Sequence, residues 1–264
     1  MTETNDLDLM LSALTEIMEE EKAKNATPLS SSTPVLPTLS QVLRRLAPLP
    51  QEALFLGMAN DGLPVLLNLY DPVPGPILIA GDESSGKTKL LQTIARAAEM
   101  LHSPDVAQYA IVTNNPDEWK NSYNSESNAG IYKIGEKNTA ELFEALVKWA
   151  HNNRGDGQSI LVLVDDLDAL IKLDEPTQQN LLRWLLLRGP SLRIWPFITL
   201  KTEKAEEQKE WLESFRTRLF GFVESADHAL ILTGDQSLNH LSAGDEFAMR
   251  EGNQLLKFWL PRID

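Results

Sequence analysis

Eight consecutive residues carry the most specific chemistry in this chain. They follow the pattern G-x-x-x-x-G-K-[ST] and are Gly81, Asp82, Glu83, Ser84, Ser85, Gly86, Lys87 and Thr88. The glycines allow a tight turn whose backbone N–H groups point inward, and with the start of a following helix these groups can surround phosphates. The pattern predicts a loop that binds a nucleoside triphosphate, with ATP as the expected ligand and Lys89 included in the binding segment.

Two side chains of this loop have specific predicted roles. Lys87 is expected to reach the β and γ phosphates as a catalytic cation, and Thr88 is expected to bind Mg²⁺ through its hydroxyl. The motif requires a strand before it and a helix after it. Residues 76–80 form a short apolar run typical of a buried strand, and apolar residues at helical spacing follow to about Leu101.

A second acidic element fits the same chemistry. The apolar run 160–164 ends in Asp165 and Asp166, and a carboxylate at the end of such a strand can support the Mg²⁺ shell. Asp165 is the predicted metal-side carboxylate, acting through water, and Asp166 is the predicted catalytic group that polarises the attacking water. The alternative is that Asp165, Asp166 and Asp168 cap the next helix.

Asp166 also limits the expected activity. Many P-loop ATPases carry Glu at this position, and Asp is one methylene shorter. A displacement of the water by about 1 Å can cost on the order of 10²-fold in rate. Nucleotide binding is therefore better supported than rapid hydrolysis.

Apolar strands alternate with helices along the chain, which predicts an α/β fold with a mostly parallel sheet, helices on both faces and flanking β-hairpins. The strands are expected at 54–57, 64–69, 76–80, 107–112, 132–134, 159–165, 195–199, 228–232, 247–250 and 255–259. The further helices are expected at 38–46, from a cap at Thr139 to 152, and at 177–188 and 203–215.

Three segments are predicted along the chain. Residues 1–25 form an acidic amphipathic helix whose apolar stripe runs from Leu7 to Met18, and residues 26–37 form a linker rich in Ser, Thr and Pro. Residues 38–264 form the ATPase domain. The stripe must be buried in a protein partner, in a neighbouring protomer of a homo-oligomer, or against its own domain.

Composition narrows the classes of function. The 264 residues contain no cysteine, which excludes thiolate metal sites and disulfides, and no apolar run approaches the roughly 20 residues that span a membrane. No signal peptide is evident, so a cytoplasmic location without membrane contact is expected. The formal net charge of −14 weakens DNA as a partner, because DNA binding ordinarily needs a basic face.

The order of the motifs resembles the FtsK/SpoIIIE motor domains of the HerA/FtsK superfamily. The resemblance covers roughly residues 54–260. It begins with Leu56-Gly57, Gly62 and Pro64-Val65. It continues through the segments PILIAGDESSGKT, LVLVDDLDAL, RIWPFITLK, SFRTRLFGFVES and LNHLSAGDEFAMREGNQLLKFWLP.

This resemblance implies a RecA-like P-loop ATPase core, which family members assemble into hexameric rings for DNA translocation or protein secretion. Thr199 falls near the family's sensor position, where Leu200 replaces the common Gln. Arg216 or Arg218 falls where an arginine finger could act in a neighbouring site, or could instead form a surface salt bridge.

Three functions remain open at this stage. The first is an ATP-hydrolysing motor domain that moves or remodels a macromolecule. The second is a nucleotide-dependent binding module that hydrolyses little ATP and docks a partner through its N-terminal helix. The third is a small-molecule P-loop enzyme such as a nucleotide kinase, although no Arg-rich lid or second acceptor site is evident.

Overall fold

The computed structural model describes most of the chain beyond the predicted linker. The described residues are 36–153, 157–172, 176–234, 236–251 and 254–264. Pro37–Asp264 forms one compact unit. The predicted helix at 1–25 and nearly all of the linker at 26–37 lie outside the described residues, so these segment boundaries stay predictions.

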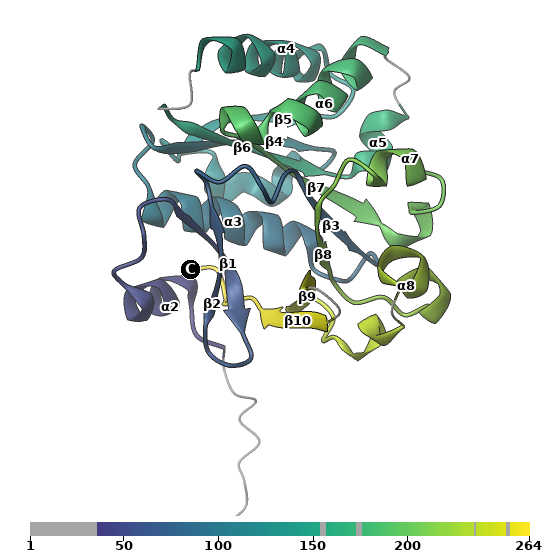
Figure 1. The fold of residues 1–264 in the computed structure, drawn as a ribbon. Helices are drawn as coiled ribbons and strands as arrows, with labels where there is room; N and C mark the ends of the chain where they lie inside the picture. Colours follow the sequence, from purple (N-terminus) through teal and green to yellow (C-terminus); the bar gives the residue numbers. More distant parts are fainter. Residues whose placement is uncertain (1–35, 154–156, 173–175, 235, 252–253) are drawn as a thin grey trace, which may run out of the picture. The chain divides into compact units, whose positions relative to one another are not determined.

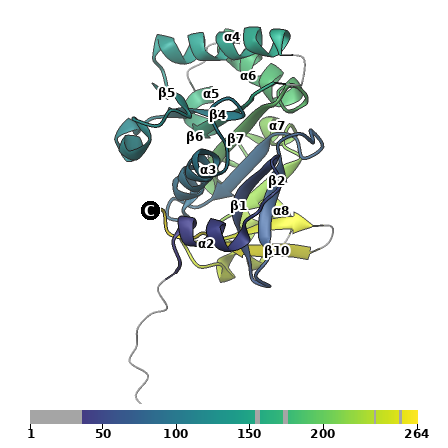
Figure 2. The same ribbon diagram turned by 90° about the vertical axis from the view of Figure 1, so that its left-hand side faces the viewer.

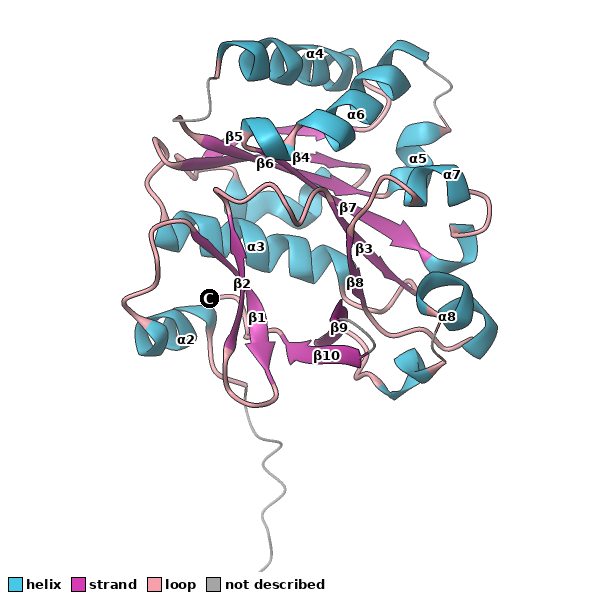
Figure 3. Ribbon diagram, viewed as in Figure 1, coloured by secondary structure: helices cyan, strands magenta, loops and turns pink. Residues whose placement is uncertain are grey.

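A ten-stranded mixed sheet forms the centre of this unit (Figures 1 and 3). Its strands are β1 (Ala53–Ala59), β2 (Pro64–Asn68), β3 (Ile77–Gly81), β4 (Ala107–Thr113), β5 (Asn128–Lys133), β6 (Ser159–Asp165), β7 (Ile194–Lys201), β8 (Thr217–Phe220), β9 (Glu246–Glu251) and β10 (Gln254–Trp259). Their spatial order is β2-β1-β10-β9-β8-β3-β7-β6-β4-β5.

The sheet has a parallel part and an antiparallel part. Strands β8, β3, β7, β6, β4 and β5 pair in parallel, and β2, β1, β10 and β9 pair antiparallel. All five residues of β3 are buried, as expected for a strand covered on both faces. The predicted α/β fold, with hairpins β1–β2 and β9–β10, is confirmed.

Helices cover both faces of the parallel part (Figure 2). The α-helices are α2 (Leu39–Leu46), α3 (Lys87–Leu101), α4 (Lys137–Asn152), α5 (Leu167–Ile171), α6 (Pro176–Arg188), α7 (Lys209–Leu212) and α8 (Ala226–Thr233). Short 3₁₀ helices lie at η1 (Pro116–Ser122), η2 (Pro190–Leu192), η3 (Thr202–Lys204) and η4 (Ser237–His240). Helices α4 and α6 pack on one face and α3 on the other. None of the described helices has both the length and the apolar character needed to cross a membrane.

The strand predicted at 228–232 is wrong. This segment is helix α8, which Ser225 caps through its hydroxyl and which Gly234 ends in a left-handed conformation with φ of 73°. Short apolar runs give no reliable period, and here Leu230 and Ile231 are about half exposed while Ala229 and Leu232 are buried.

The helix predicted at 203–215 is also wrong in extent. Only η3 and the four-residue α7 form there, and the strand β8 that follows was not predicted. Strand β8 is short and pairs through only four residues with β3, so its apolar pattern alone is weak.

Two boundaries differ from the predictions in the edge region of the sheet. Strand β5 begins at Asn128 rather than at Tyr132. Helix α4 begins at Lys137 with Glu136 as its N-cap, so Thr139 is not the cap. The buried Thr139 hydroxyl instead donates a hydrogen bond to the Lys133 carbonyl oxygen at 2.7 Å and thereby joins α4 to β5.

The capped helix α8 is testable by removing its cap. Ser225→Ala leaves the N–H of His228 without its side-chain acceptor, so we expect the free energy of unfolding to fall by about 1 kcal/mol. Urea denaturation measures this change. Ser225→Thr keeps the hydroxyl, so its free energy of unfolding should stay near that of the wild type. If Ser225→Ala were as stable as the wild type, Ser225 would not be the cap at which α8 starts.

Candidate nucleotide-binding site

The predicted phosphate loop joins the end of β3 to the start of α3. Gly86 caps α3 with φ of 88° and no side-chain hydrogen bond, so the first N–H groups of this helix are open to an anion. A Cβ atom at Gly86 would lie 2.5 Å from the carbonyl oxygen of Gly244. The loop therefore needs glycine here both for its backbone conformation and for its close approach to the turn before β9.

The turn at residues 242–245 supports the loop from the antiparallel side of the sheet. Lys89 forms an ion pair with Asp245 of this turn. The Lys89 ammonium is thus directed to the turn, and Lys89 does not line the cavity beside the phosphate loop.

Asp82 and Ser85 hold the loop in place. The carboxylate of Asp82 accepts hydrogen bonds from the Thr202 hydroxyl and, at 2.8 Å, from the N–H of Glu224. Ser85 is fully buried, and its N–H donates to the Asp82 carbonyl oxygen at 3.1 Å. The contacts of Asp82 connect the loop to the segments that follow β7 and β8, and the contact of Ser85 closes the loop on itself.

Lys87 lies almost fully buried inside the loop. Its ammonium donates to the carbonyl oxygens of Gly81 at 2.8 Å and Asp82 at 2.5 Å. Burial lowers the pKa of Lys87 from 10.5 to about 8, although the carboxylates of Asp165 and Asp82 oppose this fall. A phosphate placed in the loop would give this buried charge an anionic partner.

Thr88 and Asp165, the predicted metal ligands, lie together. The Thr88 hydroxyl donates to Asp165 Oδ2 at 2.8 Å, and the Thr199 hydroxyl donates to Asp165 Oδ1 at 2.9 Å. The Thr199 oxygen in turn accepts the N–H of Asp166 at 2.8 Å. One hydrogen-bonded chain therefore joins α3, the end of β6 and the strand β7 between β3 and β6.

Asp166 combines strain with a structural contact. Its backbone has φ of 95°, which is unfavourable for a residue with a side chain. Its Oδ1 accepts the N–H of Ala169 at 3.1 Å and caps α5. Asp166 therefore caps α5, and its predicted catalytic role stays a prediction for its second carboxylate oxygen. Asp165 instead bonds the two threonines, and Asp168 contacts Gln208 and Lys172.

A cavity of about 250 Å³ lies beside these groups. The predicted residues that line it are Glu83, Lys87, Thr88, Asp165, Asp166 and Thr199. The residues that were not predicted are Thr113, Asn114, Asn115, Glu118 and Lys201. All of the latter stand at or just beyond the carboxyl ends of β4 and β7, which meet the phosphate loop at the same edge of the sheet. Their position after buried strands is the sequence signal that could have found them.

The donor set fits Mg²⁺. This ion prefers oxygen ligands and usually keeps several waters, so it needs few protein groups. The Thr88 hydroxyl donates its proton to Asp165 and keeps its lone pairs for a cation, while Asp165 stands beside it. Within the described ranges no three His, Cys, Asp or Glu residues gather into a metal site. Bound there, Mg²⁺ would neutralise phosphate charge.

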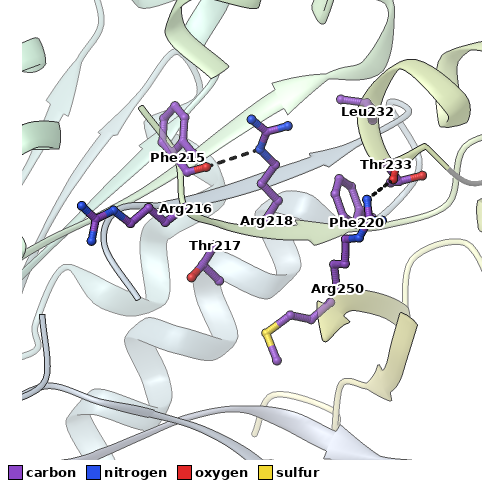
Figure 4. A pocket seen from close by; sticks show the side chains of 9 residues that line it. Phe215, Arg216, Thr217, Arg218, Phe220, Leu232, Thr233 and Arg250 are labelled. Atoms are coloured by element: carbon purple, nitrogen blue, oxygen red, sulfur yellow. Dashed lines mark hydrogen bonds between the residues drawn. The ribbon is translucent and has the colours of Figure 1, made fainter. Parts of the chain in front are cut away.

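Arg216 and Arg218 lie at the opposite end of the sheet from the phosphate loop of their own chain. Strand β8 runs parallel to β3, and Thr217 pairs with Ile77, the first residue of β3. The two arginines line a separate cavity of about 320 Å³ (Figure 4). Although this cavity is larger, we assign the nucleotide site to the cavity that holds the phosphate loop and the paired acids.

The contacts of Arg216 and Arg218 test the two predicted roles of these residues, an arginine finger and a surface salt bridge. Arg218 donates to the carbonyl oxygens of Leu212 at 2.6 Å and Phe215 at 3.4 Å, and burial lowers its pKa. Neither Arg216 nor Arg218 forms an ion pair with a carboxylate within the described part of the chain. The salt-bridge alternative is thus wrong for the described residues, and an arginine finger stays a prediction for a neighbouring chain's site.

The parallel sheet and the loop between β3 and α3 have the architecture of the P-loop fold. No family model matches the sequence, and the comparison with curated proteins finds no match. Three solved structures resemble the chain over most of its length. They are the cytoplasmic domain of the type VII secretion ATPase EccC of Thermomonospora curvata (18% identity, TM-score 0.70), ATPases 2 and 3 of EssC of Geobacillus thermodenitrificans (13%, 0.67) and the pCW3 conjugation coupling protein TcpA, a monomer form with ATPγS (15%, 0.65).

The overlap covers 86%, 80% and 86% of this chain, and 32%, 44% and 70% of the EccC, EssC and TcpA chains. The chain thus spans less than half the length of the first two. These neighbours are ATPases of the FtsK/HerA type, and the chain has their RecA-like fold. The resemblance inferred from the sequence is confirmed at the level of the fold.

The hydroxyl of Thr199 gives a direct test of the hydrogen-bonded chain. Thr199→Val keeps the shape of the side chain but leaves the Asp166 N–H without an acceptor and Asp165 without one of its donors. We expect the free energy of unfolding to fall by about 1–2 kcal/mol in urea denaturation. Thr199→Ser should retain wild-type stability. Equal stability of wild type and Thr199→Val would show that the bonds contribute nothing.

The lowered pKa of Lys87 predicts the pH dependence of nucleotide affinity. Phosphate binds the protonated ammonium and stabilises it, so below about pH 8, where Lys87 is protonated, its contribution to affinity should not change with pH. Above about pH 8 the free protein loses this proton, and affinity should fall by up to about tenfold per pH unit. Calorimetric titration with ATP in the absence of Mg²⁺ measures this. A flat profile from pH 7 to 10 would contradict the assignment.

Proposed function

We propose that this chain is an ATPase domain that binds Mg·ATP and acts as one subunit of a motor on a macromolecule. The observation that carries the proposal is the 2.8 Å hydrogen bond between Thr88 of the phosphate loop and Asp165 at the end of β6. The loop by itself supports phosphate binding, and the bond to Asp165 supports a place for the metal beside the terminal phosphates. The fold shared with EccC and EssC, which are named as ATPases, supports the motor role.

The predicted catalytic and metal-binding side chains each have a part in this proposal. Lys87 neutralises phosphate charge, and Thr88 and Asp165 hold the metal. Asp166 accepts the proton of the attacking water with the carboxylate oxygen that does not cap α5. Since one oxygen of Asp166 is used by the cap and the side chain is short, we expect slow turnover in the isolated chain.

Assembly and cargo follow from charge and sheet geometry. Because Arg216 and Arg218 stand at the far end of the sheet, they would reach a phosphate only in a second copy, which favours a cyclic homo-oligomer. We place this assembly in the cytoplasm. The net charge of −14 favours a protein or another chain over DNA as the molecule that is moved.

Two features of Asp166 favour a second function. The capping contact of Asp166 and its φ of 95° suit a site that binds ATP and hydrolyses it little. Such a protein would be a nucleotide-dependent binding module that docks a partner. The rate of ATP turnover separates the two functions, because both require nucleotide binding and only the motor requires sustained hydrolysis.

Two neighbouring lysines give the binding test a matched control. Lys87→Ala removes the ammonium inside the loop, so we expect ATP affinity to fall about 10²-fold. Lys89→Ala, two residues along the same helix, removes the cation that pairs with Asp245 and should change ATP affinity only a few-fold. Calorimetry with Mg·ATP measures both. Equal affinities of wild type and Lys87→Ala would refute the nucleotide site.

The motor role needs a measurement of turnover and assembly. ATP hydrolysis by the wild type should rise under conditions in which light scattering shows a larger assembly with Mg·ATP than without nucleotide. The assay is repeated with and without duplex DNA. Turnover that DNA stimulates and that salt suppresses would identify DNA as the cargo, whereas binding without turnover would identify the binding module.

A further inference from the structure

Lys201 lies between the phosphate loop and the metal-side acid. It is the last residue of β7, and its backbone pairs in register with Gly81, the first residue of the loop. Strand β7 itself lies between β3 and β6, which carries Asp165. The next residue, Thr202, is bonded through its hydroxyl to Asp82. The main chain on both sides of Lys201 is thus fixed beside the loop.

Lys201 and Lys87 share one cavity. Both side chains line it, and the charge of Lys201 contributes to the lowered pKa of Lys87. Two like charges in one cavity repel each other unless an anion lies near both. The acidic groups that line the same cavity are Glu83, Glu118, Asp165 and Asp166.

Glu83 is the partner that Lys201 has in this structure. The Lys201 ammonium lies 3.4 Å from Glu83 Oε1, and the two side chains are 39% and 88% exposed. An exposed pair at this distance contributes little to stability, so it is easily exchanged. Glu83 and Lys201 also line a second cavity, beside Thr202 and His228, so the pair lies at the boundary between the two cavities.

We infer that Glu83 and Lys201 form an exchangeable ion pair in which the terminal phosphate of a nucleoside triphosphate replaces Glu83 as the partner of Lys201. Lys201 is then a specificity-determining residue that distinguishes a triphosphate from a diphosphate. Phosphate is the stronger partner because it offers several charged acceptor oxygens inside the cavity. The Glu83 side chain, which is mostly exposed, is free to turn into solvent. This inference rests on the proposed nucleotide site.

The exchange predicts a selective change in affinity. Calorimetry compares ATPγS and ADP, each with Mg²⁺, on the full chain. Lys201→Met should lower the affinity for ATPγS about tenfold to a hundredfold and change the affinity for ADP by less than about twofold. Lys201→Arg should restore most of the ATPγS affinity. Glu83→Gln should raise ATPγS affinity by up to about fivefold, because the competing carboxylate is removed.

A nearby lysine supplies the control. Lys204→Met breaks a comparable pair with Glu207, and neither of these two residues lines the cavity. This variant should therefore leave the affinities for ATPγS and ADP unchanged. Equal losses for ATPγS and ADP in Lys201→Met, or no loss for either, would overturn the inference while the nucleotide site stands. If the wild type binds neither nucleotide, the proposed function and this inference fail together. Thermal unfolding of each variant separates a lost contact from a lost fold.

Discussion

The site depends on the carboxylate of Asp165, which accepts one hydrogen bond from the Thr88 hydroxyl of α3 and one from the Thr199 hydroxyl of β7. These bonds exist because three parallel strands end at one edge of the sheet, in the order β3, β7 and β6. The register pairs Ile79 of β3 with Thr199 of β7, and Val164, just before Asp165, with Ile198 of β7. The buried apolar strands therefore set the positions of the polar groups, and these polar groups contribute little to the hydrophobic core.

The antiparallel strands contribute to the site from the other side. The hairpin β9–β10 extends the sheet beyond β8, and the turn before β9 packs against Gly86 and pairs with Lys89. Asp82 ties the loop to the ends of β7 and β8. The phosphate loop is thus held by contacts from three separate stretches of chain. In the proposed function, such preorganisation would reduce the rearrangement that the loop needs to bind a phosphate.

The sequence allowed the prediction of those parts of the fold in which one strong local pattern decides the structure. The phosphate loop with its strand and helix, and the acid-ended run before Asp165, are of this kind. Helix α8 was predicted as a strand because a short apolar run does not distinguish the two, and its Ser225 cap was not recognised. The four-residue strand β8 depends on its pairing with β3, which no local pattern shows.

Contacts across the sheet were the least predictable part of the site. The contacts of Thr199 follow from its place opposite the Asp165–Asp166 bend, and the position of Lys201 beside the loop follows from its register with Gly81. Both positions depend on the order of the strands in the sheet, which the sequence alone does not reveal. The sequence offered Asp165, Asp166 and Asp168 as caps of the next helix, and only the backbone conformation after β6 shows that Asp166 caps it.

In the proposed function, Thr88 and Asp165 together complete a metal–nucleotide site on the phosphate loop. The most direct measurement is electron paramagnetic resonance of Mn²⁺ titrated into the protein with ATPγS. We expect one Mn²⁺ to bind per chain, only in the presence of the nucleotide and more weakly in Asp165→Ala. Mn²⁺ that binds equally well without nucleotide, or that binds Asp165→Ala as tightly as the wild type, would contradict this proposal.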